Sequence, residues 1–390
     1  MSRNRATEER EAISKPAGDE LEMSREMDGA ETNRTDGRGM DRQGSVRSGI
    51  ARSSWTRMAL AAACASLLAY GSAAAQSKSG TSIGAFLKIE PGARAAALGN
   101  AGVALDEGIQ SVYYNPAALG RIGEISAGFT HSEWFAGIAF DYAGLAIPLG
   151  NFGTVFGSVT SLNSGDIDVR TVDQPLGTGE RYDVSDLAIG LGYGRVITER
   201  FAAGAQLNYV EERIWHTTLR TVVLNIGTVF RISENGLRIG ASISNYGTRA
   251  RFSGRDLAIQ YDQDPETHGD NSSLPGEQYA DKFGVPIVFR FGGGMPFRVS
   301  RDATLLLALD ALHPSDNTES VSSGAELTFR EALSVRAGYQ QLFQEDSEAG
   351  LTLGAGLRGA LAEHGFQFDY AWADQGRLER THRFTFEVAF

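Results

Sequence analysis

Residues 366 to 373 read Phe-Gln-Phe-Asp-Tyr-Ala-Trp-Ala, with an aromatic side chain at every second position and a small or polar one between. Because successive side chains of a β-strand point to opposite faces, this period of two predicts a strand with one apolar and one polar face. The end of the chain repeats the pattern, with apolar Phe384, Phe386, Val388 and Phe390. A soluble sandwich and a transmembrane barrel both show such alternation, so the period alone leaves two architectures open.

The same alternation recurs back to residue 122 and predicts fourteen strands. We place them at about 122–130, 136–148, 152–163, 184–196, 200–214, 219–232, 236–248, 283–295, 302–312, 319–329, 332–344, 349–362, 364–373 and 380–390. The number is even, as in bacterial outer-membrane barrels.

The lengths of the connections decide between the two architectures. If both ends of a barrel lie on the periplasmic side, the even-numbered connections are tight turns and the odd-numbered ones are longer loops. Tight turns are predicted at 149–151, 198–200, 233–236, 330–331 and 362–363, and 296–301 is the loosest of the even set. The two long connections, 164–183 and 249–282, are both odd-numbered. A Greek-key sandwich has no reason to sort its loops in this way. We therefore predict an all-β fold: a fourteen-stranded antiparallel transmembrane barrel over residues 122–390, with its long loops outside the cell.

The first 75 residues are predicted to precede the folded part. Residues 1–50 are charged and almost without apolar side chains, which predicts disorder or an extension upstream of the true start. Residues 51–75 then resemble a signal peptide, with Arg52 and Arg57 before an apolar run and a small-residue cleavage site ending at Ala75. The one cysteine, Cys64, lies in this leader, so no thiol chemistry is expected in the mature chain. A cleaved leader fits export to the bacterial outer membrane.

Residues 76–121 are predicted to form a small hatch inside the barrel. Within Gly92–Gly120 nearly every second residue is Gly or Ala, which allows backbone to pack closely against backbone. Asn115-Pro116 forces a turn, because the residue before a proline is pushed out of the helical region.

These motifs also resemble the amino-terminal hatch of the PorV/PorQ family of FadL-like outer-membrane barrels. The residues that carry the resemblance are Gly92, Arg94, Gly99, Tyr113, Tyr114, Asn115, Pro116 and Ala117. Residues 236–247, 333–339 and 350–356 resemble the family's later strands. The resemblance implies a fourteen-stranded barrel with a hatch and a role in type IX secretion. In that role the barrel would receive cargo proteins with carboxy-terminal sorting domains and pass them to other secretion components.

Two other functions stay open: a FadL-like channel for uptake of long-chain hydrophobic molecules, and a structural barrel without a transported substrate. The long loop from 249 to 282 bears on this choice. It is strongly acidic, which suits a protein partner better than a lipid. Its acids are Asp256, Asp262, Asp264, Glu266, Asp270, Glu277 and Asp281.

Enzymatic chemistry is not expected. The six histidines are scattered and lack metal-binding spacing, and no phosphate-binding loop or nucleophile elbow is present. We predict no enzyme, no metal and no cofactor. The net charge of -12 argues against a nucleic-acid partner.

The alternation also assigns side chains to the two faces of the wall. The polar inward positions should form a neutralising network that holds the hatch, or else a path for solute; they are Asp141, Gln206, Asn208, Asp310, Glu326, Arg336, Arg358, Asp369 and Glu387. Arg94 is the expected hatch cation of this network. The outward aromatics Tyr193, Tyr209, Tyr339 and Trp372 are expected at the lipid interface. Phe386, Val388 and terminal Phe390 resemble the signal read by the barrel-assembly machinery.

Overall fold

The computed structural model describes residues 80–390, except 234–235, 268, 270–272, 345–346 and 362. The predicted extension and signal peptide, and the first residues of the predicted hatch, lie outside the described residues. Among the described residues, no helix is both long and apolar enough to cross a membrane.

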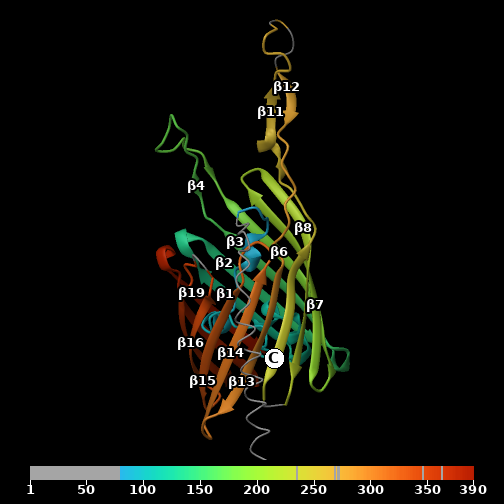
Figure 1. The fold of residues 1–390 in the computed structure, drawn as a ribbon, viewed down its shortest axis with the longest axis vertical. Helices are drawn as coiled ribbons and strands as arrows, with labels where there is room; N and C mark the ends of the chain where they lie inside the picture. The colour runs from blue at the N-terminus through green and yellow to red at the C-terminus, as the bar shows by residue number, and fades with distance from the viewer. Residues whose placement is uncertain (1–79, 234–235, 268, 270–272, 345–346, 362) are drawn as a thin grey trace, which may run out of the picture. The chain divides into compact units, whose positions relative to one another are not determined.

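All fourteen predicted strands are confirmed, and they form one closed antiparallel barrel (Figure 1). The strands are β1 (Ser126–Glu133), β2 (Ala139–Pro148), β3 (Thr154–Asn163), β6 (Val184–Thr198), β7 (Phe201–Ile214), β8 (Thr217–Arg231), β9 (Arg238–Gly247), β13 (Val288–Arg298), β14 (Ala303–Pro314), β15 (Ser320–Phe329), β16 (Leu333–Leu342), β17 (Leu351–Leu361), β18 (His364–Asp374) and β19 (Arg380–Ala389). Each strand pairs with its neighbours in sequence, and the barrel closes where β1 pairs with β19 from Ser126↔Ala389 to Glu133↔His382. Closure leaves no free sheet edge in the wall.

The barrel wall is apolar on its outer face. Outward side chains such as Phe129, Leu191 and Val335 are exposed, whereas inward side chains of the same strands are buried against the contents of the lumen. Exposed apolar side chains over a whole closed wall are typical of strands that face lipid. The outward aromatics follow this face: Tyr193, Tyr209 and Tyr339 are exposed, and Trp372 is half-buried.

The connections differ between the two ends of the barrel. One end, here the short-turn end, carries the tight turns such as 199–200 between β6 and β7. The other, the long-loop end, carries the connections 164–183 and 248–287. The sorting by parity therefore holds for the long connections, although the odd-numbered turn between β7 and β8 has only Trp215 and His216. Both ends of the wall, Ser126 and Ala389, are paired at the short-turn end.

Short elements lie within the connections. They are β4 (Ile167–Asp168) paired with β5 (Arg181–Tyr182), β10 (Ser253–Gly254) paired with β8, β11 (Ala258–Tyr261) paired with β12 (Leu274–Glu277), and the 3₁₀ turns η3 (Phe135–Gly137), η4 (Gly150–Phe152), η5 (Arg255–Leu257) and η6 (Gly376–Leu378). Residues 255–282, which include β11 and β12, extend away from the barrel at its long-loop end (Figure 1). We call this segment the acidic arm.

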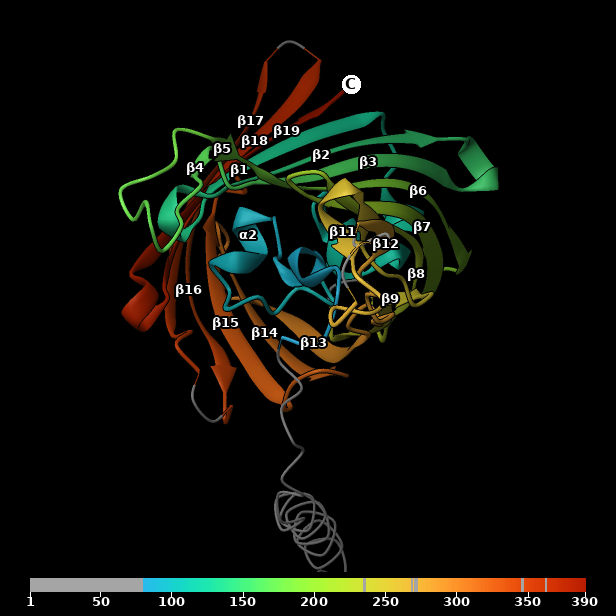
Figure 2. The same ribbon diagram turned by 90° about the horizontal axis from the view of Figure 1, so that it is seen from above.

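Residues 80–121 lie inside the ring of strands (Figure 2). This hatch contains η1 (Ala85–Lys88), α2 (Ala93–Ala96), α3 (Ser111–Tyr114) and η2 (Pro116–Arg121). Helices this short have no stability of their own, so contacts with the wall must hold them.

Two glycines show how closely the hatch backbone approaches the wall. Gly99 has φ 69°, and a Cβ there would lie 2.5 Å from the carbonyl oxygen of Tyr339 on β16. A Cβ at Gly204 of β7 would lie 2.2 Å from the carbonyl oxygen of Pro116. Only glycine fits at either position, so small residues on both sides allow the hatch to sit against the strands.

Candidate functional site in the barrel lumen

The turn at Asn115-Pro116 is fixed by the Asn115 side chain. Asn115 is fully buried in an extended conformation, and its Nδ2 donates to the carbonyl oxygens of Val103 (2.8 Å) and Thr228 (3.0 Å). Its Oδ1 accepts from the backbone N–H of Ala117 at 3.1 Å, which caps η2. One side chain thus ties two parts of the hatch to β8.

Tyr113 and Tyr114 of α3 contact earlier residues of the hatch, near Leu87 and Gly102. Tyr113 donates its hydroxyl to the carbonyl oxygen of Leu87 at 2.8 Å and meets Tyr142 of β2 edge-on, with ring centroids 5.6 Å apart. Tyr114 is fully buried beneath Gly102. Burial raises the pKa of both phenols, so both stay neutral. Of the other predicted hatch residues, Gly92 directly precedes α2, and Ala117 packs against Ala202 of β7 and Val229 of β8.

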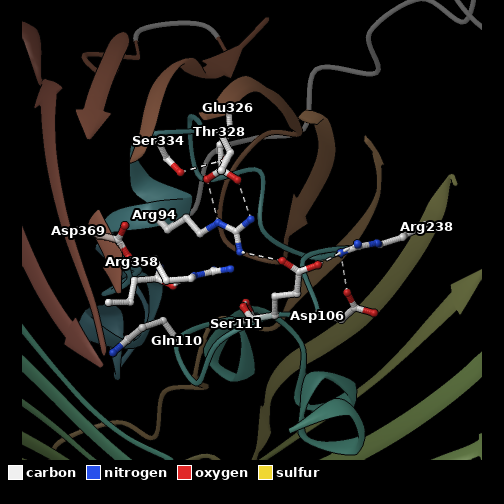
Figure 3. A network of polar contacts seen from close by, with 12 residues as sticks. Arg94, Asp106, Gln110, Ser111, Arg238, Glu326, Thr328, Ser334, Arg358 and Asp369 are labelled. Atoms are coloured by element: carbon white, nitrogen blue, oxygen red, sulfur yellow. Dashed lines mark hydrogen bonds and ion pairs between the residues drawn. The ribbon is translucent and has the colours of Figure 1, made fainter. Parts of the chain in front are cut away.

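A charged network holds α2 to the wall at the short-turn end (Figure 3). Arg94 donates two hydrogen bonds to Glu326 of β15, at 2.9 Å and 2.7 Å. Glu326 also accepts from Arg336 of β16, which donates in turn to Asp369 of β18 at 2.7 Å. Burial lowers the pKa of the Arg94 guanidinium, but Glu326 and Glu107 outweigh this effect and raise it, so Arg94 stays charged. The structure thus brings together four residues that the sequence analysis had assigned to one network.

A second anchor, which the sequence analysis did not predict, forms around Asp106. Its carboxylate is fully buried and accepts from Arg231 of β8 (2.7 Å) and Arg238 of β9 (2.8 Å), and Arg121 lies 3.4 Å away. The neighbouring Glu107 pairs with Arg238 at 2.8 Å. Asp106 and Glu107 are the only acids between residues 92 and 120. Their isolation among small and apolar residues is the feature of the sequence from which this anchor could have been predicted.

Other predicted lumen residues contact the hatch or line the space around it. Asp310 accepts from the backbone N–H of Val103 at 2.8 Å, and Glu387 accepts from the N–H groups of Ile109 and Gln110, each at 3.2 Å. Arg358 donates to Gln367 rather than to an acid. Most of these contacts pair wall carboxylates with hatch N–H groups, which leaves few buried donors of the hatch without an acceptor.

The prediction for Asp141 is wrong. Its neighbours Phe140 and Tyr142 are the buried, inward side chains of β2, so Asp141 lies on the outward face, where it pairs with His131 of β1 at 2.7 Å. The physical reason is that the hatch presents apolar surface to this part of the wall. Phe140 and Tyr142 of β2 therefore face inward, and Asp141 between them faces outward.

The middle of the lumen is lined by uncharged polar side chains. Gln206 donates to Ser158 at 2.8 Å, and a cavity of about 20 Å³ lies among amides and hydroxyls. Its polar lining includes Ser158, Thr160, Gln206, Asn208, Asn225, Ser244 and Asn245. That volume matches about one water molecule. The lining also contains one charged residue, Arg290, which pairs with Glu90 of the hatch at 2.9 Å, both buried.

Toward the long-loop end the lumen becomes apolar. Ile83, Phe86 and Leu87 of the hatch pack against inward side chains of β2, β6, β7 and β8; these are Phe140, Ala188, Val210, Leu219 and Val223. A cavity of about 620 Å³ lies at the same end, between the 164–183 loop and the β7–β8 turn. Its apolar lining consists of Ile167, Val169, Tyr182, Ile214 and Trp215.

The predicted assembly residues lie on the strand that closes the barrel. Phe386 and Phe390 are exposed, and Val388 is half-buried. The backbone N–H of Phe390 donates to the carbonyl oxygen of Ile125 at 2.8 Å, just before β1. Their role in assembly stays a prediction.

Comparison with known proteins gives similarity to solved structures only. No family model matches the chain, and no curated protein matches it. The toluene transporter TbuX of Ralstonia pickettii is 12% identical, with a TM-score of 0.48, over 77% of this chain and 98% of that one. The toluene transporter TodX of Pseudomonas putida is 10% identical, with a TM-score of 0.48, over 77% and 97%. A Pseudomonas aeruginosa FadL homologue is 10% identical, with a TM-score of 0.46, over 76% and 96%.

Similarity of this degree is too weak to assign a function. The PorV/PorQ assignment stays a prediction. Among the residues that the structure describes, no group of three or more His, Cys, Asp or Glu side chains is arranged to hold a metal ion.

Proposed function

We propose that this protein is an outer-membrane barrel that takes up hydrophobic molecules, with the hatch closing the lumen until a ligand arrives. Outer-membrane location is supported by the closed wall, its exposed apolar outer face and the sorting of long loops to one end. The long-loop end then faces the outside of the cell. Lipid would surround the wall, and the barrel-assembly machinery would insert it.

The observation that carries the proposal is an apolar route at the long-loop end. The 620 Å³ cavity and the apolar cluster share strand faces, because Ile214 and Val210 lie on the inward face of β7 and Thr217 and Leu219 on that of β8. The buried Glu212 lies between Val210 and Ile214 on the same face, opposite Asp186 of β6. The cavity volume is within the range of about 300–1,000 Å³ that small-molecule sites occupy. A hydrophobic molecule captured between the loops would therefore pass the Glu212 and Asp186 carboxyl groups and then meet the apolar cluster as it moved inward.

The element that blocks this route is η1. Phe86 and Leu87 fill the apolar cluster, and the segment is held there by a few polar contacts. The N–H of Gly84 donates to Glu212 at 2.8 Å, that of Ile83 donates to the carbonyl oxygen of Gly284 at 3.1 Å, and Lys88 pairs with Asp316 at 2.6 Å. Withdrawal of η1 would leave an apolar pocket between four strands. The charged contacts of α2 lie farther along the hatch, so they need not break.

A binding experiment tests this proposal. Replacement of Trp215 by Ala removes a large apolar side chain from the cavity, and it should weaken binding of a long-chain fatty acid or of toluene by about tenfold, since burial of such a side chain contributes roughly 1.5–3 kcal/mol. Phe343→Ala is the matched control, because Phe343 is exposed in another connection at the same end. Saturable binding that is equal in the wild type and Trp215→Ala contradicts the proposal.

A second candidate, a role in protein secretion, rests on the acidic arm. Ile259 and Tyr261 of β11 share one face with Leu274 and Gly276 of β12, and both Ile259 and Tyr261 are exposed. An exposed ribbon with one apolar face and many acids suits a basic, partly apolar protein such as secreted cargo. Shortening the arm should then leave cargo unattached at the cell surface while fatty-acid binding is unchanged. Normal attachment in correctly assembled protein removes this candidate.

A further inference from the structure

The short-turn end of the lumen holds a second cavity, of about 510 Å³. Unlike the cavity among the loops, it is lined mainly by charged and polar side chains from the hatch and from β9 and β13–β18. We call it the arginine vestibule, after the five arginines in its lining: Arg94, Arg238, Arg298, Arg336 and Arg358. Four carboxylates share that lining: Glu107, Glu326, Glu331 and Asp369.

Three of these four carboxylates already form ion pairs with arginines of the hatch or of the wall. Glu326 accepts from both Arg94 and Arg336, Asp369 accepts from Arg336, and Glu107 pairs with Arg238. The adjoining Asp106 is shared among Arg121, Arg231 and Arg238. With this anchor included, seven guanidinium groups face five carboxylates at one end of a chain whose net charge is -12.

Among the described residues, two arginines of the vestibule form no hydrogen bond or ion pair with an acid. Arg358 of β17 directs its Nε and Nη2 to the neutral amide oxygen of Gln367, at 3.0 Å and 2.8 Å, which leaves its Nη1 free to donate. Arg358 and Arg94, both labelled in Figure 3, line the same cavity. Arg298 lies on the inward face at the end of β13, where it is exposed to the cavity. Both guanidiniums therefore face a space large enough for a small molecule.

We propose that the arginine vestibule binds a small soluble anion whose carboxylate or phosphate groups pair with Arg298 of β13 and Arg358 of β17, which line the same cavity. Guanidinium groups recognise both kinds of group through charge-assisted hydrogen bonds. The lining comes from both the wall and the hatch, and such partial enclosure strengthens charge-assisted contacts relative to an open surface. The excess of positive charge also attracts anions to this mouth of the barrel. The site lies at the opposite end from the hydrophobic route and does not rest on the proposed uptake function.

Isothermal titration calorimetry on the full-length protein in detergent micelles at low ionic strength tests the site, with succinate and inorganic phosphate as the two probes. The wild type should bind at least one of them, and the probe that binds tells whether carboxylate or phosphate is the preferred group. Arg298→Gln and Arg358→Gln should each weaken binding by about tenfold, and the double variant should abolish it, because each removes a charge-assisted hydrogen bond. Arg200→Gln is the matched control: Arg200 is exposed in a tight turn at the same end but outside the cavity.

A gain of affinity gives a second, independent readout. Glu331 lines the vestibule as a competing carboxylate at its rim, so Glu331→Gln should tighten anion binding. This result does not depend on the folding of the arginine variants, whose assembly is checked by heat-modifiable mobility. Absence of binding to the wild type by both probes overturns the proposal. So does unchanged affinity in both arginine variants, or weaker binding in Glu331→Gln.

Discussion

Arg94 of the hatch and Glu326 of β15 meet through two parallel hydrogen bonds, 2.9 Å from Nε to Oε2 and 2.7 Å from Nη2 to Oε1. The two residues are 232 positions apart in sequence. Both side chains are almost fully buried, at 12% and 5% exposure. A fork-to-fork pair of this kind fixes orientation as well as distance, so it sets where α2 lies against the wall.

Replacement of Arg94 by Gln should loosen the hatch. The change leaves Arg336 as the remaining cation beside Glu326. We therefore expect the free energy that holds α2 to the wall to fall by about 3 kcal/mol, the lower end of the range for a broken buried ion pair. Hydrogen exchange of the α2 amides should then become about a hundredfold faster. Arg181→Gln, which removes an exposed pair with Asp166 and Asp168 in the 164–183 loop, should change exchange in the hatch very little. Equal protection in Arg94→Gln and the wild type would show that other contacts hold α2.

The Asn115-Pro116 turn should matter as much as the charged network. Replacing both residues by Ala removes the donor from two buried carbonyl oxygens and the cap of η2, so the hatch should open more often. The strands do not depend on this turn, and the barrel should still assemble. Ion conductance of the protein in planar bilayers should therefore increase, whereas Asn151→Ala in the β2–β3 turn should leave it unchanged. Wild-type conductance in the double variant contradicts this role.

The strands were predictable because alternation is a local property of the chain. Each strand needs only its own residues to show one apolar and one polar face, and closure follows from their even number and the sorting of loops. Arg336 and Asp369 were assigned inward on the same basis. Their contact crosses Gly356 of β17, the strand between β16 and β18, and the predicted strand order already placed these three strands side by side.

Contacts that join distant segments were not predictable from one sequence. The pairing of Asp106 with Arg231 and Arg238 spans more than a hundred residues, and no local pattern encodes it. Asp141 failed for a related reason: whether Phe140 and Tyr142 face lipid or lumen depends on the apolar surface that the hatch places beside them. Which face of an alternating strand points into the lumen therefore depends on whether the hatch presents an apolar or a polar surface to that strand.

Acid should weaken docking of the hatch through Glu107. Burial raises the pKa of this carboxyl group, but the guanidiniums of Arg94 and Arg238 outweigh that effect and hold the pKa below its ordinary value of 4.5. A carboxyl group whose pKa is lower in the folded state stabilises that state above its unfolded pKa, and the stabilisation is lost as the pH falls through the folded pKa. Protection factors of the hatch amides, which correct for the intrinsic slowing of exchange in acid, should therefore fall below about pH 4.5. Glu107→Gln should flatten that dependence, and a wild-type pH profile in this variant would assign the effect to another group.

Deletion of Phe390 should reduce assembly more than the stability of the finished barrel. The residue lies at the end of the strand that closes the wall, its N–H donates to Ile125, and its exposed ring contributes little packing. Folded barrel in the outer membrane, measured by heat-modifiable mobility, should fall sharply, while the fraction that does fold should unfold at the same denaturant concentration as the wild type. Unchanged yield in the truncated protein would discard the signal role.

The orientation of the barrel decides which cavity a ligand from outside would meet first. An epitope tag inserted at Asp264 in the acidic arm and another at Glu199 in the β6–β7 turn lie at opposite ends of the wall. Because long loops of outer-membrane barrels face outward and tight turns face the periplasm, antibody should label intact cells that carry the Asp264 tag and only permeabilised cells that carry the Glu199 tag. Both positions are exposed, so neither insertion should disturb the wall, and heat-modifiable mobility serves as the control for assembly. Surface labelling at Glu199 with none at Asp264 would invert the molecule: it would turn the arginine vestibule to the outside and remove the loop cavity as the point of entry for a hydrophobic ligand.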